Sequence, residues 1–358
     1  MKTKIYGTIG PACYDMDTLV RLFEKGMTGI RINLSHSNLE ESSDWIKNIH
    51  KAYAKYRKNV EKERDAKNDS AAMCMPEILM DLCGPELRIG KLVAERLLRE
   101  GDVVTLVAEG QNNLFDPTEI PVPELILPYL KPGQEILLDD GKILLKTEEL
   151  LGTRTGIVAE CAVLRGGELK SRKSIALPGV ALYPPTLTER DLENIRAAKK
   201  YGITGVMLPF VRNKEDLKNL KQAFIDENVD DIHIFAKIEN IEGVNQLPEL
   251  LPYCDEIVIA RGDLGNAMPL WELPVVQAQI AEQCRKAKKP FMVVTQMLAS
   301  MEKSAVPTRA EVSDIFRAVS EGAASVMLTG ETAAGTYPVQ AMEYLVNTVQ
   351  EAEWYMER

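Results

Sequence analysis

Short apolar runs alternate along the chain with longer segments that have helical periodicity. The runs are rich in aliphatic and β-branched residues, and most of them become polar only near their last positions. Continuous apolar strands that alternate with amphipathic helices are typical of a parallel sheet covered by helices. Eight such runs are each followed by a helical segment, and they begin at Lys4, Gly29, Glu77, Gly205, Ile234, Glu256, Pro290 and Ser325.

Eight strand-then-helix units favour one closed architecture. They predict an α/β fold of the (β/α)8 TIM barrel type, and a doubly wound open sheet is the alternative. Polar residues follow nearly all of the runs, at the strand ends where barrel enzymes carry their active sites. The barrel is therefore the preferred prediction.

A segment with a different pattern of apolar and polar residues interrupts the strand-helix alternation between the third and fourth runs. Residues 89–178 show period-two alternation, and the pair Asp140-Gly141 is a hairpin turn signal. These features predict a small all-β domain, built from antiparallel hairpins, inserted after the third barrel strand. The barrel would then comprise 1–88 and 179–358, and the insert could act as a lid at its catalytic end.

Composition and charge narrow the class of protein. The chain has 43 basic and 53 acidic residues and a net charge of −10, which does not suggest a nucleic-acid partner. Its six cysteines form no C-x-x-C pair, as expected for reduced thiols in a cytoplasmic protein. The start of the chain lacks a signal-peptide pattern, and no apolar run is long enough to cross a bilayer, so no membrane partner is expected.

Charged residues of opposite sign stand two positions apart near the end of the run IFAKIEN. Side chains alternate faces along a strand, so Lys237 and Glu239 should point the same way. Glu239 and Asp263 are hard oxygen ligands on consecutive strands, as Mg²⁺ prefers. Arg31 and Lys237 are cations suited to a phosphoryl group in transit.

Further polar residues at the strand ends extend this set. Asn33, Ser35 and Asp81 offer oxygens for a second cation, and the Thr295 hydroxyl could relay a proton through water. The turn at Gly262 has backbone N–H groups that could hold a carboxylate.

Each of these residues also has a purely structural interpretation. A Lys–Glu pair at a strand end is often only an ion pair, and Asp81 could simply hydrogen-bond the following turn. The segment from Ser35 to Asn38 could be a helix cap, and Thr295 and Thr329 could serve packing alone. The functional interpretation is favoured because five or more strands end in mutually compatible phosphate and metal ligands.

Nine segments resemble pyruvate kinases in order and spacing, from the first residues to about Pro338 and most weakly in the insert. They are TKIYGTIGPA, GIRINLSHS, LMDLCGPELRIG, LPFVRNKEDL, AKIENIEGV, IARGDLG, VVTQMLASM, PTRAEVSDI and VMLTGETAAGTYP.

The resemblance implies a barrel with a β-domain lid and a phosphotransferase of glycolysis. The reaction would convert phosphoenolpyruvate and ADP to pyruvate and ATP, with Mg²⁺ (or Mn²⁺) and K⁺ as cofactors and a homo-oligomer as a possible assembly. Lys237 would stabilise the phosphoryl group, Arg31 would grip the phosphate, and Glu239 and Asp263 would bind Mg²⁺.

The resemblance assigns the remaining roles residue by residue. Thr295 would lie near the carbon that receives the proton, and Thr329 stands where the family has a serine in a related proton path. The amides of Gly262 and Asp263 would bind the substrate carboxylate. The K⁺ site would comprise Asn33, Ser35, Asp81 and the Leu82 carbonyl, with Glu86 as in K⁺-requiring members, and the nucleotide side would comprise Asn33, His36, Arg88 and Lys173.

Departures from the family pattern lie on the expected rim of the barrel. The usual D-T-K-G-P is D-L-C-G-P here, so Leu82 and Cys83 replace threonine and lysine. Pro209 replaces a common serine, and Asn266-Ala267 replace a Val-Glu pair. These changes could alter substrate choice or subunit packing. Members of the family usually carry a further C-terminal effector domain, which this sequence lacks, so no control by fructose bisphosphate is expected.

Three alternatives stay open at the level of sequence. The protein could transfer the phosphoryl group to a different acceptor, or it could be a metal-dependent aldolase or lyase acting on an enolpyruvate. It could also be a non-catalytic sensor of phosphoenolpyruvate, although a sensor has little need of a proton relay.

Overall fold

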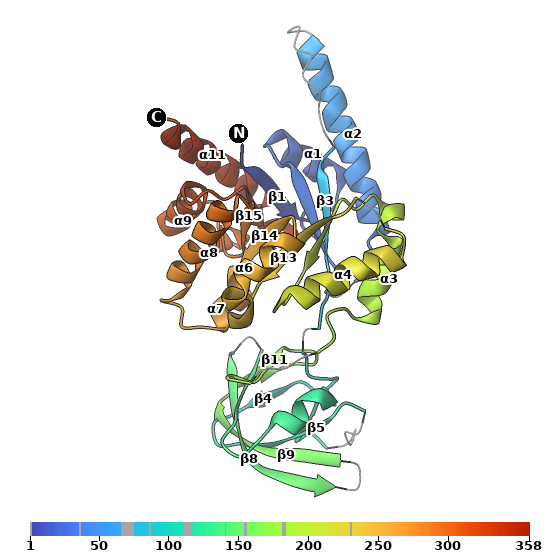
Figure 1. The fold of residues 1–358 in the computed structure, drawn as a ribbon, viewed down its shortest axis with the longest axis vertical. Coiled ribbons are helices and arrows are strands. Elements are labelled where there is room, and N and C mark those ends of the chain that lie inside the picture. The colour runs from blue at the N-terminus through green and yellow to red at the C-terminus, as the bar shows by residue number, and fades with distance from the viewer. Residues whose placement is uncertain are drawn as a thin grey trace. The chain divides into compact units, whose positions relative to one another are not determined.

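The computed structural model describes residues 2–35, 37–65, 75–85, 87–110, 116–139, 141–153, 156–180, 184–229 and 231–358. It divides into two compact units (Figure 1). The first comprises Met1–Gly84 and Thr186–Arg358, and the second comprises Pro85–Pro185. The segment predicted as an inserted domain, 89–178, lies within the second unit, which leaves the first after its third strand.

Eight parallel strands of the first unit close into a barrel, as the strand-then-helix pattern predicts. The order around the barrel is β1-β16-β15-β14-β13-β12-β3-β2, and the pairing of the first strand with the last excludes the open sheet. The strands are β1 (Lys4–Thr8), β2 (Gly29–Asn33), β3 (Glu77–Asp81), β12 (Gly205–Leu208), β13 (His233–Ile238), β14 (Glu256–Ala260), β15 (Phe291–Val294) and β16 (Ser325–Leu328).

Helices follow the strands and cover the outside of the barrel (Figure 1). The N-termini of two of them are fixed by reciprocal capping boxes, Thr188 with Asp191 and Thr308 with Glu311. The helices are α1 (Met16–Glu24), α2 (Ser43–Asp65), α3 (Glu189–Ala197), α4 (Lys214–Asp226), α5 (Ile241–Asn245), α6 (Leu247–Leu250), α7 (Arg261–Asn266), α8 (Leu273–Ala287), α9 (Arg309–Ser320), α10 (Gly330–Ala333) and α11 (Pro338–Met356). None of the helices in these described ranges is both long and apolar enough to span a bilayer.

The inside of the barrel is a packed apolar core that large side chains fill. Tyr6 and Phe235 are its largest members, and both are almost fully buried. Glycines make room for them, because a Cβ atom at Gly29 would lie 2.2 Å from the Tyr6 ring and one at Gly205 would lie 2.7 Å from the Phe235 ring. The functional groups must therefore lie at the strand ends, beyond this core.

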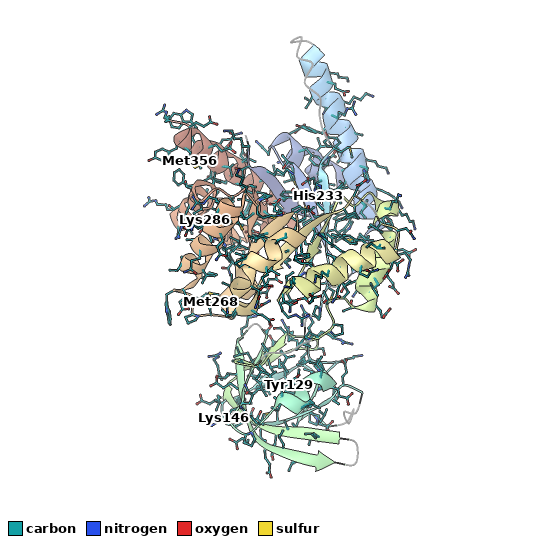
Figure 2. All side chains as sticks on the ribbon, in the orientation of Figure 1. Tyr129, Lys146, His233, Met268, Lys286 and Met356 are labelled. Atoms are coloured by element: carbon teal, nitrogen blue, oxygen red, sulfur yellow. The ribbon has the colours of Figure 1, made fainter. Side chains whose placement is uncertain are left out.

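The second unit is a β structure with its own apolar core. Figure 2 shows the side chains of this unit, among them Tyr129 and Lys146. Its six-stranded sheet has the order β11-β7-β8-β9-β5-β6, and a two-stranded sheet pairs β10 with β4. The elements are β4 (Arg96–Leu98), β5 (Val103–Ala108), β6 (Glu119–Val122), η1 (Glu124–Tyr129), β7 (Glu135–Leu138), β8 (Ile143–Thr153), β9 (Gly156–Arg165), β10 (Gly167–Leu169) and β11 (Ile175–Ala176).

The hairpins expected in the second unit are present, with one difference. β7 and β8 pair in antiparallel fashion around a turn that contains Gly141 at φ 81°, and β8 pairs with β9 in the same way. β5 and β6 instead run parallel. Period-two alternation reports which face of a strand is buried, but it carries no information on the direction of the neighbouring strand.

Candidate active site

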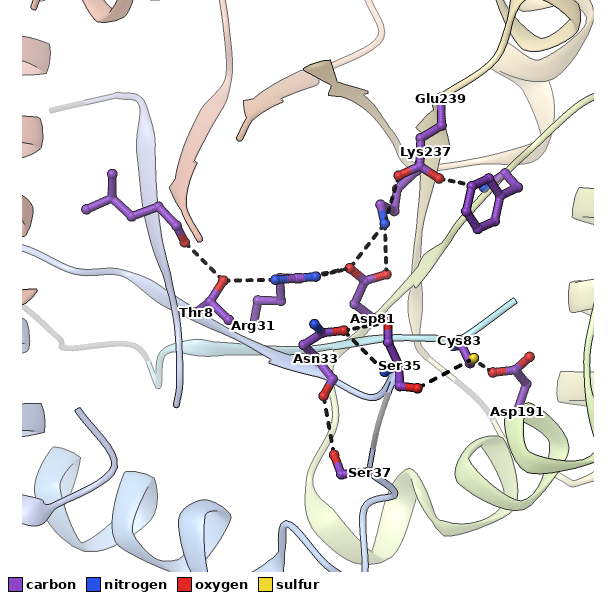
Figure 3. A network of polar contacts seen from close by, with 12 residues as sticks. Thr8, Arg31, Asn33, Ser35, Ser37, Asp81, Cys83, Asp191, Lys237 and Glu239 are labelled. Atoms are coloured by element: carbon purple, nitrogen blue, oxygen red, sulfur yellow. Dashed lines mark hydrogen bonds and ion pairs between the residues drawn. The ribbon is translucent and has the colours of Figure 1, made fainter. Parts of the chain in front are cut away.

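The carboxylate of Asp81, the last residue of β3, holds two cations at the end of the barrel. Arg31 Nε and Nη2 lie 2.8 and 2.6 Å from Asp81 Oδ2, and Lys237 Nζ lies 3.2 Å from the same oxygen (Figure 3). The Asp81 side chain is only 2% exposed, and those of Arg31 and Lys237 are 13% exposed. Arg31 Nη1 also donates to Thr8 Oγ1 at 3.2 Å. Four strands therefore contribute to this cluster, the adjacent β1, β2 and β3 together with β13, which carries Lys237.

Glu239 follows β13 and faces the same side as Lys237, as the period-two argument predicts. Its Oε1 lies 2.9 Å from Lys237 Nζ, and its Oε2 accepts a 2.7 Å hydrogen bond from the backbone N–H of Phe210. Phe210 donates from a left-handed backbone conformation, with φ 54°. Glu239 Oε1 is fully buried, and the ammonium of Lys237 meets it as an ion pair whose angles depart from good hydrogen-bond geometry.

Burial and charge act in opposite directions on this pair. Burial raises the pKa of Glu239, and the negative charges of Asp263 and Asp81 add to this effect, whereas Lys237 opposes it. Burial alone would lower the pKa of Lys237, but the charges of Asp81 and Glu239 outweigh burial and raise it. Lys237 is therefore a firmly protonated cation.

The donor set of Glu239 and Asp263 fits a divalent cation. Glu239 offers a buried oxygen that accepts no hydrogen bond, and Asp263 on α7 is exposed and close enough for its charge to act on Glu239. In the described part of the chain no three His, Cys, Asp or Glu side chains cluster as metal ligands. Mg²⁺ does not require such a cluster, because it commonly uses one or two carboxylates together with substrate oxygens and water.

Thr295 and Gly262 meet just beyond the ends of the neighbouring strands β15 and β14. Thr295 directly follows β15, and its Oγ1 accepts a 2.8 Å hydrogen bond from the Gly262 N–H while donating to the Val294 carbonyl at 2.6 Å. The Gly262 amide predicted to bind a substrate carboxylate thus contacts Thr295 in this structure. A carboxylate would have to compete with the Thr295 hydroxyl for that N–H.

Thr329 is held at the end of β16 by a buried carboxylate. Its N–H and hydroxyl both donate to Glu331 Oε2, at 2.7 and 3.2 Å, and Glu331 Oε1 accepts from the N–H of Leu298. Glu331 is 1% exposed. This carboxylate couples the loops that follow β15 and β16, which carry the two threonines of the predicted proton path.

Asn33 and Ser35 form a local turn after β2. Asn33 Oδ1 accepts from the Ser35 N–H at 3.2 Å and from the Ser35 hydroxyl at 2.9 Å. Asp81 has both of its oxygens in contact with cationic side chains, and Leu82 is buried. These residues lie at the ends of adjacent strands, where the K⁺ site is predicted, but the structure assigns them polar partners within the protein.

Four of the predicted residues are not among the described residues of the barrel unit. His36 and Glu86 lie outside the described residues. Arg88 and Lys173 belong to the second unit, where Arg88 Nη1 donates to the Arg172 carbonyl at 2.8 Å and Lys173 Nζ lies 2.7 Å from Asp139 Oδ1.

Asp191 is a residue of the site region that the sequence analysis missed. It is fully buried, and it accepts a 2.9 Å hydrogen bond from the backbone N–H of Cys83 (Figure 3). It also accepts a 3.2 Å hydrogen bond from the backbone N–H of Gly84. It also caps α3 through Thr188. The motif T-x-x-D predicts the capping role of Asp191 from the sequence. Its contact with the Cys83 amide could not be predicted in this way, because the two residues lie 108 positions apart.

The rim departures adjoin this anchored loop. Gly84 has φ 60°, and a Cβ atom there would lie 2.5 Å from Cγ of Pro209. Cys83, which replaces a lysine of the family pattern, is partly buried, with its Sγ 3.8 Å from the Ser35 carbonyl oxygen. Pro209 and Cys83 thus belong to the packing between the segments that follow β2, β3 and β12.

Comparisons with known proteins identify the family. The profile described as "Pyruvate kinase, barrel domain" matches residues 1–342. A pyruvate kinase of Thermococcus litoralis is 37% identical over 358 residues, which cover 99% of this chain and 70% of that protein. Pyruvate kinases of Bacillus licheniformis and Geobacillus stearothermophilus are 35% and 38% identical, and the matches cover 98% and 96% of this chain.

The chain spans 57% and 55% of the length of these last two relatives. The match nevertheless runs through every barrel strand, including those that carry Arg31, Asp81, Lys237 and Glu239. On these grounds the chain belongs to the pyruvate kinase family.

Proposed function

We propose that this protein transfers the phosphoryl group of phosphoenolpyruvate to ADP, giving pyruvate and ATP. One observation carries the proposal: Arg31 and Lys237 are fixed by the buried carboxylate of Asp81, beside the buried Glu239 oxygen that accepts no hydrogen bond. Two cations held without freedom to reorganise suit a phosphoryl group whose charge shifts during transfer.

The charge of the site indicates what must accompany the substrate. Arg31 and Lys237 are the positive groups, and Asp81, Glu239 and Asp263 are carboxyl groups, so these side chains carry no surplus of positive charge even where the Glu239 carboxyl, whose pKa burial raises, is protonated. A phosphate ester would find no net attraction to this set unless cations were added. The balance therefore supports a requirement for Mg²⁺ and a further cation such as K⁺.

Glu239 and Asp263 would hold the divalent ion, for which Mn²⁺ could substitute. When bound, this ion would neutralise phosphate oxygens and the developing charge. We place K⁺ near Asn33, Ser35, Asp81 and the Leu82 carbonyl, on their motif positions and on their common location at the strand ends.

The chain's own groups provide for the proton as well. Thr295 lies on the β15 side of the barrel end, away from the phosphoryl-side cations of β2 and β13. We assign it to delivery of a proton to the methylene carbon of the enolate, with Thr329 in the same path. Gly262 and Asp263 would bind the substrate carboxylate.

The nucleotide side is proposed on motif positions alone. We assign Asn33, His36, Arg88 and Lys173 to it, with the second unit acting as a lid during the reaction. We place the protein in the cytoplasm on the spacing of its cysteines, which contains no C-x-x-C pair, and assembly of identical chains stays a prediction.

The proposal is tested by incubating the protein with phosphoenolpyruvate, Mg²⁺, K⁺ and a panel of nucleoside diphosphates. We expect pyruvate and a triphosphate in equal amounts with ADP, and loss of both products when Mg²⁺ is omitted. Omitting K⁺ in the same series tests the second cation.

Other products would point to the alternatives. Pyruvate without a triphosphate would indicate a lyase or hydrolase, a phosphorylated product other than ATP would indicate another acceptor, and binding without turnover would indicate a sensor. The relatives named above are pyruvate kinases, which favours ADP as the acceptor.

A further inference from the structure

The turn that follows β15 has an unusual backbone. Thr295 and Gln296 both adopt left-handed conformations, with φ 68° and φ 53°, although neither is a glycine. For a β-branched residue such as Thr295 this conformation is a genuine outlier. Two such residues in succession persist only where the surrounding structure determines their conformation.

A buried guanidinium supplies that surrounding structure. Arg261, the first residue of α7, is 8% exposed. Its Nη2 donates to the Thr295 carbonyl at 2.7 Å and lies 3.0 Å from Met297 Sδ, and its Nε donates to the Val294 carbonyl at 3.4 Å. One side chain thus contacts residues before, within and after the strained turn.

The charge of Arg261 is balanced by a carboxylate of α9, the helix that follows β15. Its Nη1 is paired with Asp314 on α9, whose side chain is 33% exposed. A buried cation without this partner would be costly, so Asp314 helps to keep the guanidinium in place. The fixed fork of donors on arginine matches several acceptors at once, which a lysine ammonium cannot do with the same geometry.

The hydroxyl of Thr295 is oriented from the same segment. Gly262, which follows Arg261 in the chain, donates its N–H to Thr295 Oγ1 at 2.8 Å. Residues 261 and 262 therefore hold both the carbonyl and the hydroxyl of Thr295. The orientation of the Thr295 hydroxyl group therefore depends on the contact between α7 and the end of β15.

We propose that Arg261 is a positioning residue that acts through Thr295, fixing the direction of its hydroxyl for the proton-transfer step. This inference rests on the proposed function, in which Thr295 serves the proton side of the reaction. Arg261 does not need to touch the substrate for this role, because its donors are directed at the turn and at Asp314.

A double-mutant cycle on Arg261→Lys and Thr295→Ala tests the coupling. Loss of the hydroxyl in Thr295→Ala should lower the rate of methyl-proton exchange of pyruvate with deuterated water by about 100-fold, as for loss of a positioned acid–base group. Arg261→Lys should lower it by about tenfold, with a smaller change in the pyruvate concentration for half-saturation. The double variant should be no more than about twofold slower than Thr295→Ala, because Arg261 would have nothing left to position.

The matched control is Arg196→Lys. Arg196 is an exposed arginine on α3 that also contacts a carboxylate with two donors, Nε and Nη2, at 2.8 and 2.7 Å from Glu227. Its exchange rate should equal that of the wild type within about twofold, as expected for an exposed pair. If the fold-losses of Arg261→Lys and Thr295→Ala instead multiply in the double variant, the inference is overturned. Such a result would show that Arg261 acts independently of Thr295.

A second measurement separates this inference from the proposed function. Amide hydrogen exchange across residues 294–298, without substrate, should be at least about tenfold faster in Arg261→Lys than in the wild type, because the turn loses its fixed donors. If Arg261→Lys does not fold, Asp314→Asn alters the more exposed partner of the same ion pair. Amide hydrogen exchange across residues 294–298 should then be faster than in the wild type, but by less than is expected for Arg261→Lys. Unchanged amide hydrogen exchange in the folded variant overturns the inference. A wild-type protein that shows neither phosphoryl transfer nor exchange of the pyruvate methyl protons overturns the proposed function instead. In that case the amide hydrogen exchange alone tests whether Arg261 fixes the turn.

Discussion

At the scale of single residues, the site is organised by buried carboxylates that hold cations or backbone amides. Asp81 fixes Arg31 and Lys237, and Glu239 fixes the left-handed backbone at Phe210. These contacts keep the charged groups in place before any substrate arrives. Preorganised charge of this kind lowers the barrier of a reaction because it need not be rearranged as charge develops.

The role of Lys237 is tested by its replacement with methionine, which keeps the length of the side chain without its charge. Lys237→Met should lower phosphoryl transfer to ADP by on the order of 10³-fold. Exchange of the pyruvate methyl protons should stay measurable, because Thr295 lies at the end of a different strand. Coupled detection of ATP and proton NMR of pyruvate in deuterated water measure the two reactions.

The control for Lys237→Met is Lys214→Met, which removes an exposed lysine that pairs with Glu249. The control should leave both rates unchanged. Transfer at the wild-type rate in Lys237→Met would show that this lysine is only a structural partner of Asp81 and Glu239.

Glu256 is a titratable residue at the opposite end of the barrel from the site. Burial raises the pKa of its carboxyl to about 7, and Glu77 adds to this, although the hydrogen bond from Ser325 and the charge of Lys4 oppose it. The unfolded-state pKa is near 4.5. A carboxyl whose pKa is higher in the folded state contributes stability that is fully present below pH 4.5 and is lost as the pH rises through 7.

Glu256→Gln should remove this dependence, because glutamine is neutral at every pH and keeps a hydrogen-bonding group. Relative to the wild type, the variant should gain about 3 kcal/mol in the free energy of unfolding between pH 4.5 and pH 8.5. Urea unfolding followed by tryptophan fluorescence reports this unit specifically, since Trp45, Trp271 and Trp354 all lie in it. The control is Glu24→Gln at an exposed site, for which the difference from the wild type in the free energy of unfolding should not vary with pH. The same constant difference in Glu256→Gln would contradict a raised pKa of Glu256 in the folded state.

At the scale of elements, the sequence predicts what is encoded locally. Each barrel strand is a short apolar run, and the alternation of faces places Lys237 beside Glu239. The fold class and this pairing could therefore be predicted. Contacts between distant segments could not be. Asp191 reads as a helix cap, and the fit of Tyr6 against Gly29 needs the register between β1 and β2.

Asp191 connects the end of β3 to the start of α3, and its removal tests that connection. Asp191→Asn should lower the free energy of unfolding of the barrel unit by about 2 kcal/mol, because an amide offers one acceptor oxygen where Cys83, Gly84 and Thr188 use two. Tryptophan-detected urea unfolding measures the change.

Asp15→Asn is the matched control for Asp191→Asn. Asp15 caps α1 by accepting from the Asp17 and Thr18 amides with one exposed oxygen, and asparagine caps a helix equally well. Its effect should be below about 0.5 kcal/mol. Equal losses in the two variants would mean that Asp191 serves only as a cap.

At the scale of the whole molecule, the two units have separate cores, and the chain passes between them twice. The chain leaves the barrel unit and re-enters it at the same place. Asp191 accepts from Gly84, the last residue before the chain leaves, and from Thr188, two residues after Thr186, where the barrel unit resumes. The cut ends of the barrel unit are therefore within reach of a short linker.

Replacing 85–185 with a short glycine-serine linker should leave a folded barrel, since every barrel strand and the interior core belong to the first unit. The tryptophan-detected unfolding transition should stay cooperative, and pyruvate methyl-proton exchange should persist because Thr295, Lys237 and Glu239 are retained. Phosphoryl transfer to ADP should fall by at least about 100-fold, because the groups proposed to orient the nucleotide are removed. A barrel that folds and still phosphorylates ADP at the full rate would show that the second unit does not position the nucleotide, and would move Arg88 and Lys173 out of the proposed site.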